Sequence, residues 1–99
     1  MRPESLLAVA LVAFAGCALA PQHFVHLEQA ESAYRDATAD PAVSRHAAAE
    51  LRAAREVLDR AIEARATLQD AAEVDHLAYV ARQRIEIARE AARYRETVR

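Results

Sequence analysis

The chain has 99 residues, of which 54% are hydrophobic and 28% charged, with a formal net charge of −2. This length has room for one small domain. A single Cys excludes a disulfide scaffold and a Cys-based structural zinc site, and a single Gly excludes Gly-rich phosphate loops. The near-neutral charge also lacks the basic field that duplex nucleic acid needs, so we expect no nucleic-acid partner.

The first 16 residues have the pattern of a cleavable export signal. A short polar start that contains Arg2 precedes an unbroken run of ten apolar residues, 6–15. A helix needs about 20 apolar residues to cross a bilayer, so this run is too short for a membrane span. It matches the hydrophobic region of a signal helix instead.

The residues at the end of this run resemble the lipobox of bacterial lipoproteins. The stretch Phe14-Ala15-Gly16-Cys17 places small residues directly before the one Cys of the chain. The resemblance implies cleavage before Cys17 and attachment of membrane lipid to its sulfur. A second cleavage site stays open after Ala18-Leu19-Ala20, the small-x-small pattern of ordinary signal peptidase, although Pro21 follows it directly and disfavours it.

The same resemblance predicts where the protein is located. Ala18 rather than Asp follows Cys17, which in such lipoproteins implies export to the outer membrane. Two or more acyl chains give stable anchoring, whereas one gives only marginal binding. Residues 17–22 are then the lipidated Cys and a short tether, and at about 3.4 Å per residue the tether reaches less than about 20 Å. We therefore expect the folded part close to the periplasmic face of the membrane.

Residues 23–99 predict an all-α domain, an antiparallel bundle of three helices at about 23–39, 42–68 and 71–98. This part contains no Gly and one Pro, and Ala, Glu, Arg, Leu and Gln dominate it. In the first helix the apolar residues recur at 3-4-3 spacing, which is one helical face. Asp40-Pro41 ends this helix, because Pro disfavours helical geometry in the residue before it. The members of the face are Leu27, Ala30, Tyr34 and Ala37.

The second predicted helix begins between Pro41 and Ala47. Asp40 as the N-cap with Pro41 at the first helical position is one start, and Ser44 is a later candidate cap. Arg65 falls within its apolar stripe, where we expect it to snorkel or to form an ion pair. The stripe consists of Leu51, Ala54, Leu58, Ala61, Ile62 and Leu68, with Val57 at its edge.

The third predicted helix starts at Asp70-Ala71-Ala72-Glu73, a capping box with Asp in place of Ser or Thr. At about 1.5 Å per residue it approaches 40 Å against about 25 Å for the first helix, so it overhangs that helix. One apolar line contains Val74, Leu77, Ala81, Ile85, Ala88 and Ala92. A second line contains Val80, Ile87, Ala91, Tyr94 and Val98. Both lines can pack inside the bundle, one against each neighbouring helix, but beyond the overhang the first helix no longer covers Tyr94 and Val98. The second line is therefore the candidate contact surface for a second copy or an envelope protein.

The chain offers little material for catalysis or metal binding. His23 and His26 lie three residues apart, but no carboxylate completes a ligand set with them. His76 lies beside Asp75 and three residues before Tyr79, and no nucleophile or oxyanion donor accompanies this group. We therefore predict no catalytic, cofactor-binding or metal-binding residues and no enzymatic activity.

Three stretches resemble an uncharacterised family of bacterial helical lipoprotein domains, which often precede OmpA-like peptidoglycan-binding domains. The resemblance extends over about residues 17–95. Because this sequence ends at Arg99 without such a second domain, we do not expect wall binding. The stretches are 27–34 (LEQAESAY), 50–55 (ELRAAR) and above all 75–88 (DHLAYVARQRIEIA).

Two functions from different classes are compatible with these observations. The first is a lipid-anchored outer-membrane lipoprotein whose helical module faces the periplasm and acts in structure or interaction without enzymatic activity. The second is an exported periplasmic accessory protein that binds a small ligand or a metal through its His residues or a gap between helices. Neither the partner nor the physiological process follows from the sequence.

Overall fold

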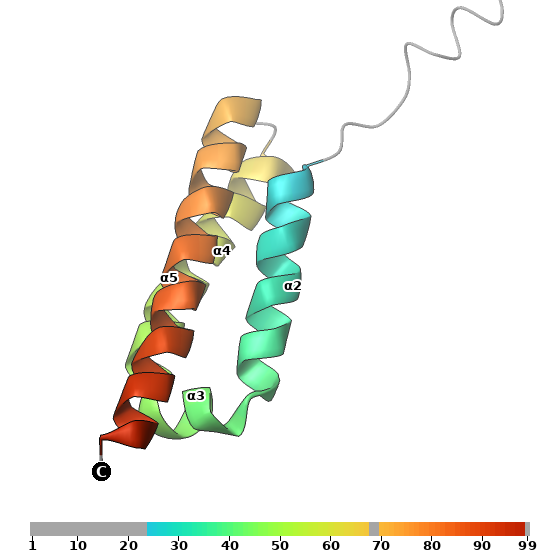
Figure 1. Ribbon diagram of the computed structural model, residues 1–99. Helices are drawn as coiled ribbons and strands as arrows, with labels where there is room; N and C mark the ends of the chain where they lie inside the picture. Colours follow the sequence, from blue (N-terminus) through green and yellow to red (C-terminus); the bar gives the residue numbers. More distant parts are fainter. Residues whose placement is uncertain (1–23, 68–69, 99) are drawn as a thin grey trace, which may run out of the picture.

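The computed structural model describes residues 24–67 and 70–98, and all regular secondary structure in these ranges is helical. The helices are α2 (Val25–Ala39), α3 (Pro41–His46), α4 (Ala48–Ala66) and α5 (Ala71–Thr97). Three of them, α2, α4 and α5, lie side by side with α4 antiparallel to the other two, and α3 crosses the end at which α5 finishes (Figure 1). The predicted all-α bundle is confirmed for these residues, whereas the predicted signal helix, Cys17 and the tether lie outside them.

The sequence predicts a single helix over 42–68; residue 68 lies outside the described residues, and the described part of the segment forms two helices, α3 and α4. Asp40 caps α3, since its Oδ1 accepts a hydrogen bond of 2.9 Å from the backbone N–H of Ala42, and Pro41 occupies the first turn. The Asp40-Pro41 start is therefore right for α3, and the alternative cap Ser44 lies inside this helix. Ala47 then breaks the helix with φ −140° and ψ 34°, and α4 begins at Ala48.

Tertiary packing explains the break at Ala47, because local sequence preference opposes it. Ala47 starts a run of three Ala residues, the strongest helix formers. The break places the side chains of Val43 and Ala47 in the core, where they are 0% and 1% exposed. They pack in one cluster with Ile85 and Ala92 of α5. The predicted overhang of the last helix is thus covered on one side by α3.

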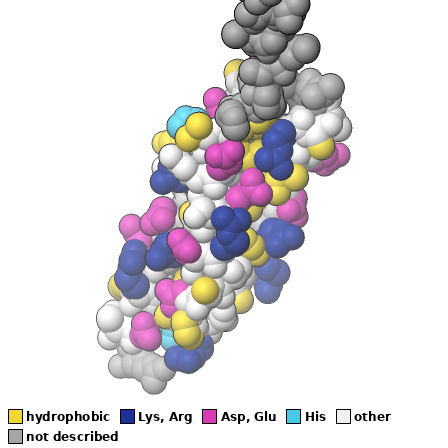
Figure 2. All heavy atoms as spheres, turned by 90° about the vertical axis from the view of Figure 1, so that its right-hand side faces the viewer, with side chains coloured by type: hydrophobic (Ala, Val, Ile, Leu, Met, Phe, Trp, Pro, Cys, Tyr) yellow, Lys and Arg dark blue, Asp and Glu magenta, His cyan; other side chains and the backbone are white. Residues whose placement is uncertain are grey.

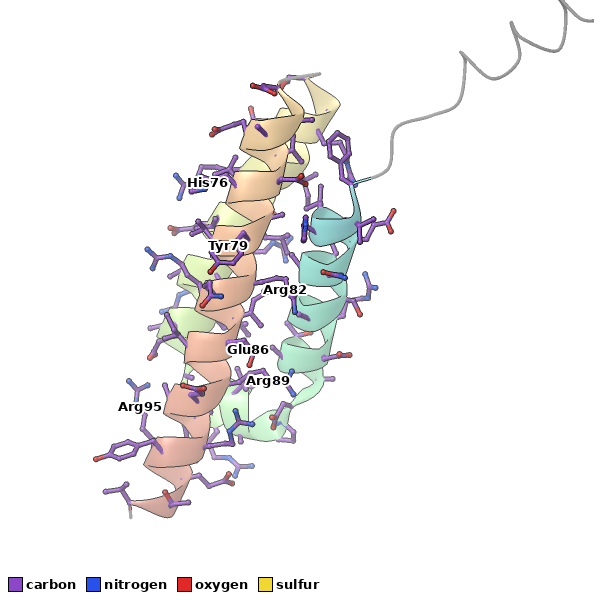
Figure 3. All side chains as sticks on the ribbon, turned by 45° about the horizontal axis from the view of Figure 1, so that its top comes forward. His76, Tyr79, Arg82, Glu86, Arg89 and Arg95 are labelled. Atoms are coloured by element: carbon purple, nitrogen blue, oxygen red, sulfur yellow. The ribbon has the colours of Figure 1, made fainter. Side chains whose placement is uncertain are left out.

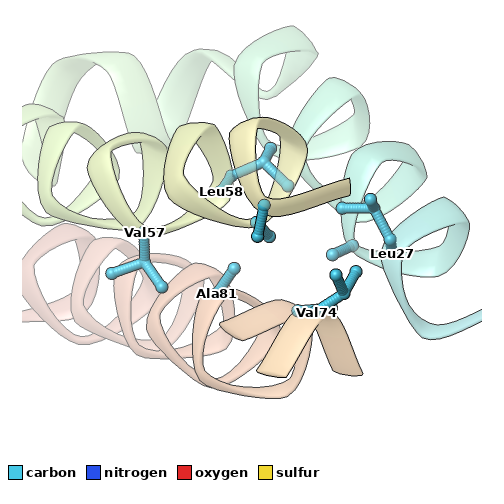
Figure 4. Close-up of a cluster of buried hydrophobic side chains, with 9 residues drawn as sticks. Leu27, Val57, Leu58, Val74 and Ala81 are labelled. Atoms are coloured by element: carbon cyan, nitrogen blue, oxygen red, sulfur yellow. The ribbon is translucent and has the colours of Figure 1, made fainter. Parts of the chain in front are cut away.

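The core consists of two clusters along the bundle, and both are rich in Ala. The cluster near the start of α5 combines Leu27 of α2, Val57 and Leu58 of α4, and Val74 and Ala81 of α5 (Figure 4). The cluster near the end of α5 contains Ala37, Val43, Ala47, Leu51, Ala54, Ile85, Ala88 and Ala92. Ala lets helix backbones approach closely but buries little apolar area, so a domain of this size is only marginally stable.

The buried face of α5 differs by one residue from the predicted line. The structure buries Val74, Ala78, Ala81, Ile85, Ala88 and Ala92, which follow one another at strict 4-3-4-3-4 spacing. Leu77, predicted as a member, is only partly buried and packs at the rim of the first cluster. The most extensive helix packing is between α4 and α5. At such a close contact the small Ala78 fits where a Leu would hold the helices apart.

Asp70 caps α5, as predicted, and its removal is expected to be measurable. Its Oδ1 accepts a hydrogen bond of 3.1 Å from the backbone N–H of Ala72. We expect Asp70→Ala to lower the free energy of unfolding by about 1 kcal/mol, and Asp70→Asn, which keeps an acceptor oxygen, to lower it much less. Urea denaturation followed by circular dichroism measures both. Equal losses in the two variants would assign the effect to charge and contradict a capping role.

Candidate functional site

The five residues of the predicted contact surface lie on α5, away from its buried face. Ile87, Tyr94 and Val98 are 55%, 68% and 58% exposed. Val80 and Ala91 are only partly buried, and each packs against the edge of one core cluster. The structure therefore leaves the three large residues Ile87, Tyr94 and Val98 open and partly covers Val80 and Ala91.

A regular spacing links these residues into one continuous strip. Arg84 completes the series, because it lies four residues after Val80 and three before Ile87. At 100° per residue, Ile87 and Tyr94 lie about 180–200° from the fully buried Ile85. Sequence reasoning from apolar residues alone missed Arg84, although the 3-4 spacing indicates it. We refer to these six residues as the outer seam: Val80, Arg84, Ile87, Ala91, Tyr94 and Val98.

Arginine side chains fix α5 to its neighbours on both sides of the bundle. On one side, Arg82 Nη1 donates to Gln29 Oε1 of α2 at 2.9 Å. On the other side, Arg95 Nη1 lies 2.8 Å and 3.0 Å from the two carboxylate oxygens of Glu50 in α4. The same nitrogen donates to the backbone oxygen of His46 in α3 at 2.6 Å. Figure 3 shows Arg82 and Arg95 on different sides of α5, so these contacts join the helix to neighbours on two sides.

The contacts between α2 and α4 confirm one prediction about a charged residue. Arg65, expected to snorkel or pair, lies with its Nη1 3.5 Å from Glu31 Oε1 of α2. Nearby, the Arg55 guanidinium lies 5.3 Å from the centre of the Tyr34 ring and 3.0 Å from Asp59 Oδ1. Interaction with Tyr34, and then with Asp59, raises the pKa of Arg55 above its ordinary value. These side chains stabilise helix contacts at the surface of the bundle.

Two of the histidines that the sequence singled out, His26 and His76, line an open groove. The groove has a volume of about 510 Å³ and is lined by His26, Ala72, Asp75, His76 and Tyr79. Within residues 24–67 and 70–98 no group of three or more His, Cys, Asp or Glu side chains has a metal-binding arrangement. His23 lies outside these ranges. His26 and His76 therefore line the same groove, but among the described residues they are not part of a group of three or more candidate metal ligands.

Comparison with family models matches residues 25–97 to a family described as a domain of unknown function, DUF4398. The chain belongs to this family. The match covers all four described helices, from the start of α2 to the end of α5. Comparisons with curated proteins and with solved structures found no match.

The surface of the DUF4398 domain mixes both signs of charge. Figure 2 shows Arg and acidic side chains interspersed over the face turned to the viewer. Such a face is typical of solvated helices. None of the described helices is both long and apolar enough to cross a membrane.

Proposed function

We propose that the protein is a lipoprotein of the bacterial outer membrane, anchored through acylated Cys17, whose DUF4398 domain acts at the periplasmic side by helix-face contacts without enzymatic activity. The observation that carries the proposal is the place of Cys17. The one Cys of the chain follows directly on the apolar run 6–15 and the small residues Ala15 and Gly16. A thiol in this position is what transfer of a diacylglyceryl group requires.

The arrangement of the helices supports this proposal. Six residues, 18–23, separate Cys17 from Phe24, where the described domain begins. At about 3.4 Å per residue they reach about 20 Å, so the start of α2 stays near the lipid surface. The end of α4 and the start of α5 lie at this same end of the bundle, and the C-terminal end of α5 lies at the other (Figure 1). In the proposed arrangement Tyr94 and Val98, near the end of α5, lie at the end of the bundle farthest from the membrane.

The side-chain hydrogen bonds of the described residues that involve Thr and Arg hold the helices of the domain together. Thr38, Thr67 and Thr97 donate to backbone oxygens within one helical turn. The Arg side chains bond to carboxylates, an amide and a backbone oxygen of neighbouring turns and helices. Bonds of these kinds stabilise helices and fix their packing.

Metabolic labelling with radioactive palmitate and intact-mass spectrometry test the anchor. We expect the mature protein to begin at Cys17 and to carry acyl chains, and we expect Cys17→Ser to lose the label completely. Ala18→Ser is the matched control, because it changes the adjacent residue and leaves the sulfur in place. A mature form that begins at Pro21 without acyl mass would contradict the proposal.

A further inference from the structure

We propose that the outer seam of α5 binds the outer seam of a second copy of this chain, with the two α5 helices parallel and related by a two-fold axis. The open part of the seam consists of Ile87, Tyr94 and Val98, which are all more than half exposed. Exposed large apolar residues gathered on one helix face mark an interaction site. The spacing of the seam and the charges beside it indicate that the binding partner is a second copy of the chain.

The spacing of the outer seam is that of a coiled-coil contact. From Val80 its members follow at 4-3-4-3-4 residues, the same repeat that packs the buried face of α5, about 120° away around the helix, into the bundle. Two helices that carry this repeat interlock when their seams face each other. In heptad terms, Arg84, Ala91 and Val98 occupy the a positions, and Val80, Ile87 and Tyr94 the d positions.

The charges beside the seam select the parallel orientation. Glu90 lies on one flank of the seam and Arg95 on the other, five residues later, and both are exposed. Parallel helices bring opposite flanks together, so Glu90 of each copy meets Arg95 of the other copy, and symmetry forms this ion pair twice. In an antiparallel pair the same flank of both helices meets, so Glu90 faces its own flank in the second copy. That flank carries Gln83 and does not carry Arg95. The charge complementarity therefore exists only in the parallel arrangement.

Arg95 can form this contact without losing its bonds inside the domain. Its described hydrogen bonds to Glu50 and to the His46 backbone all come from Nη1. A guanidinium has five N–H donors, and its Nε and Nη2 groups carry three of them. The Arg95 side chain is 50% exposed. Glu50 thus holds the guanidinium in a fixed position from which it can also reach the second copy.

Arg84 is the charged member of the seam, and it favours two strands over more. A single cation at an a position fixes register and strand number at some cost in stability. In a pair of helices the aliphatic part of Arg84 packs along the seam while its guanidinium extends to water. Larger assemblies enclose this position and leave the charge buried.

The contact is short, so we expect it to be weak between free molecules and stronger between anchored ones. Confinement to one membrane raises the effective concentration of the two copies. A parallel pair also places both N-terminal ends on the same side, as two anchors in one membrane require. This strengthening rests on the proposed function, whereas the interface itself rests only on α5.

Cysteine cross-linking in isolated envelopes tests the orientation. In the full chain, Ala91→Cys places a thiol at an a position, which meets its own equivalent only when the helices are parallel. We expect oxidation to give a disulfide-linked dimer at least about tenfold faster than the control Glu86→Cys, which lies on α5 away from the seam. The unmodified chain shows whether Cys17 contributes any cross-link. Equal rates for Ala91→Cys and Glu86→Cys would overturn the proposal.

Charge reversal tests the complementarity. We expect purified full-chain Glu90→Arg to dimerise about tenfold more weakly than the unmodified chain, because two attractive pairs become repulsive. Arg95→Glu is expected to behave alike, and a mixture of the two variants is expected to restore dimers, since each then supplies the missing partner. Circular dichroism confirms folding of each variant. If both variants dimerised as strongly as the unmodified chain, the proposed interface would be refuted. The acyl mass at Cys17 tests the anchor separately.

Discussion

Replacing Ile85 by Ala is expected to lower the free energy of unfolding by about 3 kcal/mol. Ile85 is fully buried at 0% exposure in the middle of α5. It belongs to the four largest fully buried side chains, with Leu27, Val43 and Val74, so the core has little else to compensate its loss. Domains of this size have only several kcal/mol of stability. Thermal denaturation should show a large decrease in Tm, with a partly unfolded population at 37 °C.

Ile87→Ala is the matched control for this loss. Ile87 has the same chemistry two residues further along α5, but it is 55% exposed. We expect its replacement to change the free energy of unfolding by less than about 0.5 kcal/mol. Measurement at low protein concentration keeps any contact between copies out of the comparison. Similar losses from Ile85→Ala and Ile87→Ala would mean that the outward side of α5 is also core.

Replacing Cys17 by Ser is expected to remove the protein from the outer-membrane fraction. Each buried methylene of an acyl chain contributes about 0.8 kcal/mol, and two or more chains together give stable anchoring. Without the sulfur no chain can be attached, and the remaining residues 18–23 contain one large aliphatic side chain, Leu19. The variant is expected either in the soluble fraction after cleavage behind Ala20 or uncut in the inner membrane.

Fractionation of envelopes by density, followed by immunoblotting, measures this redistribution. Ala18→Asp is the matched control, since it leaves Cys17 and its acyl chains in place. By the lipoprotein resemblance it is expected to retain the acylated protein at the inner membrane. If Cys17→Ser stayed in the outer membrane at the level of the unmodified protein, a contact other than the lipid would hold it there.

Local signals in the sequence were enough to predict most of the helical architecture. The side-chain acceptors Asp40 and Asp70 precede helices α3 and α5, and both cap them in the structure. The break at Ala47 has no such signal, because it lies in a run of Ala and depends on the burial of Val43 against distant residues of α5. Tertiary packing decides such a position, and single-sequence reasoning does not contain it.

Contacts between side chains of different helices were predictable only where a charged residue interrupted an apolar stripe. Arg65 lay within an apolar stripe, and this conflict predicted a partner, which the structure identifies as Glu31. Arg95 lay among other Arg residues at a helix end, where interaction with the helix dipole was a sufficient explanation. Its contacts with Glu50 and the His46 backbone depend on how α3 and α4 sit beside α5. The predicted role of the outer seam stays a prediction.

The Ala-rich interior makes the domain unequally sensitive to substitution. Ordering an Ala side chain costs almost no rotamer entropy, so the bundle can close with few large apolar groups. The fully buried Ala54, Ala61, Ala81 and Ala88 define how near the backbones lie. Any bulkier residue there wedges the helices apart and forces strained rotamers on its neighbours. The range of tolerated substitutions in this domain should consequently be smallest at the buried Ala positions and largest at the charged surface positions.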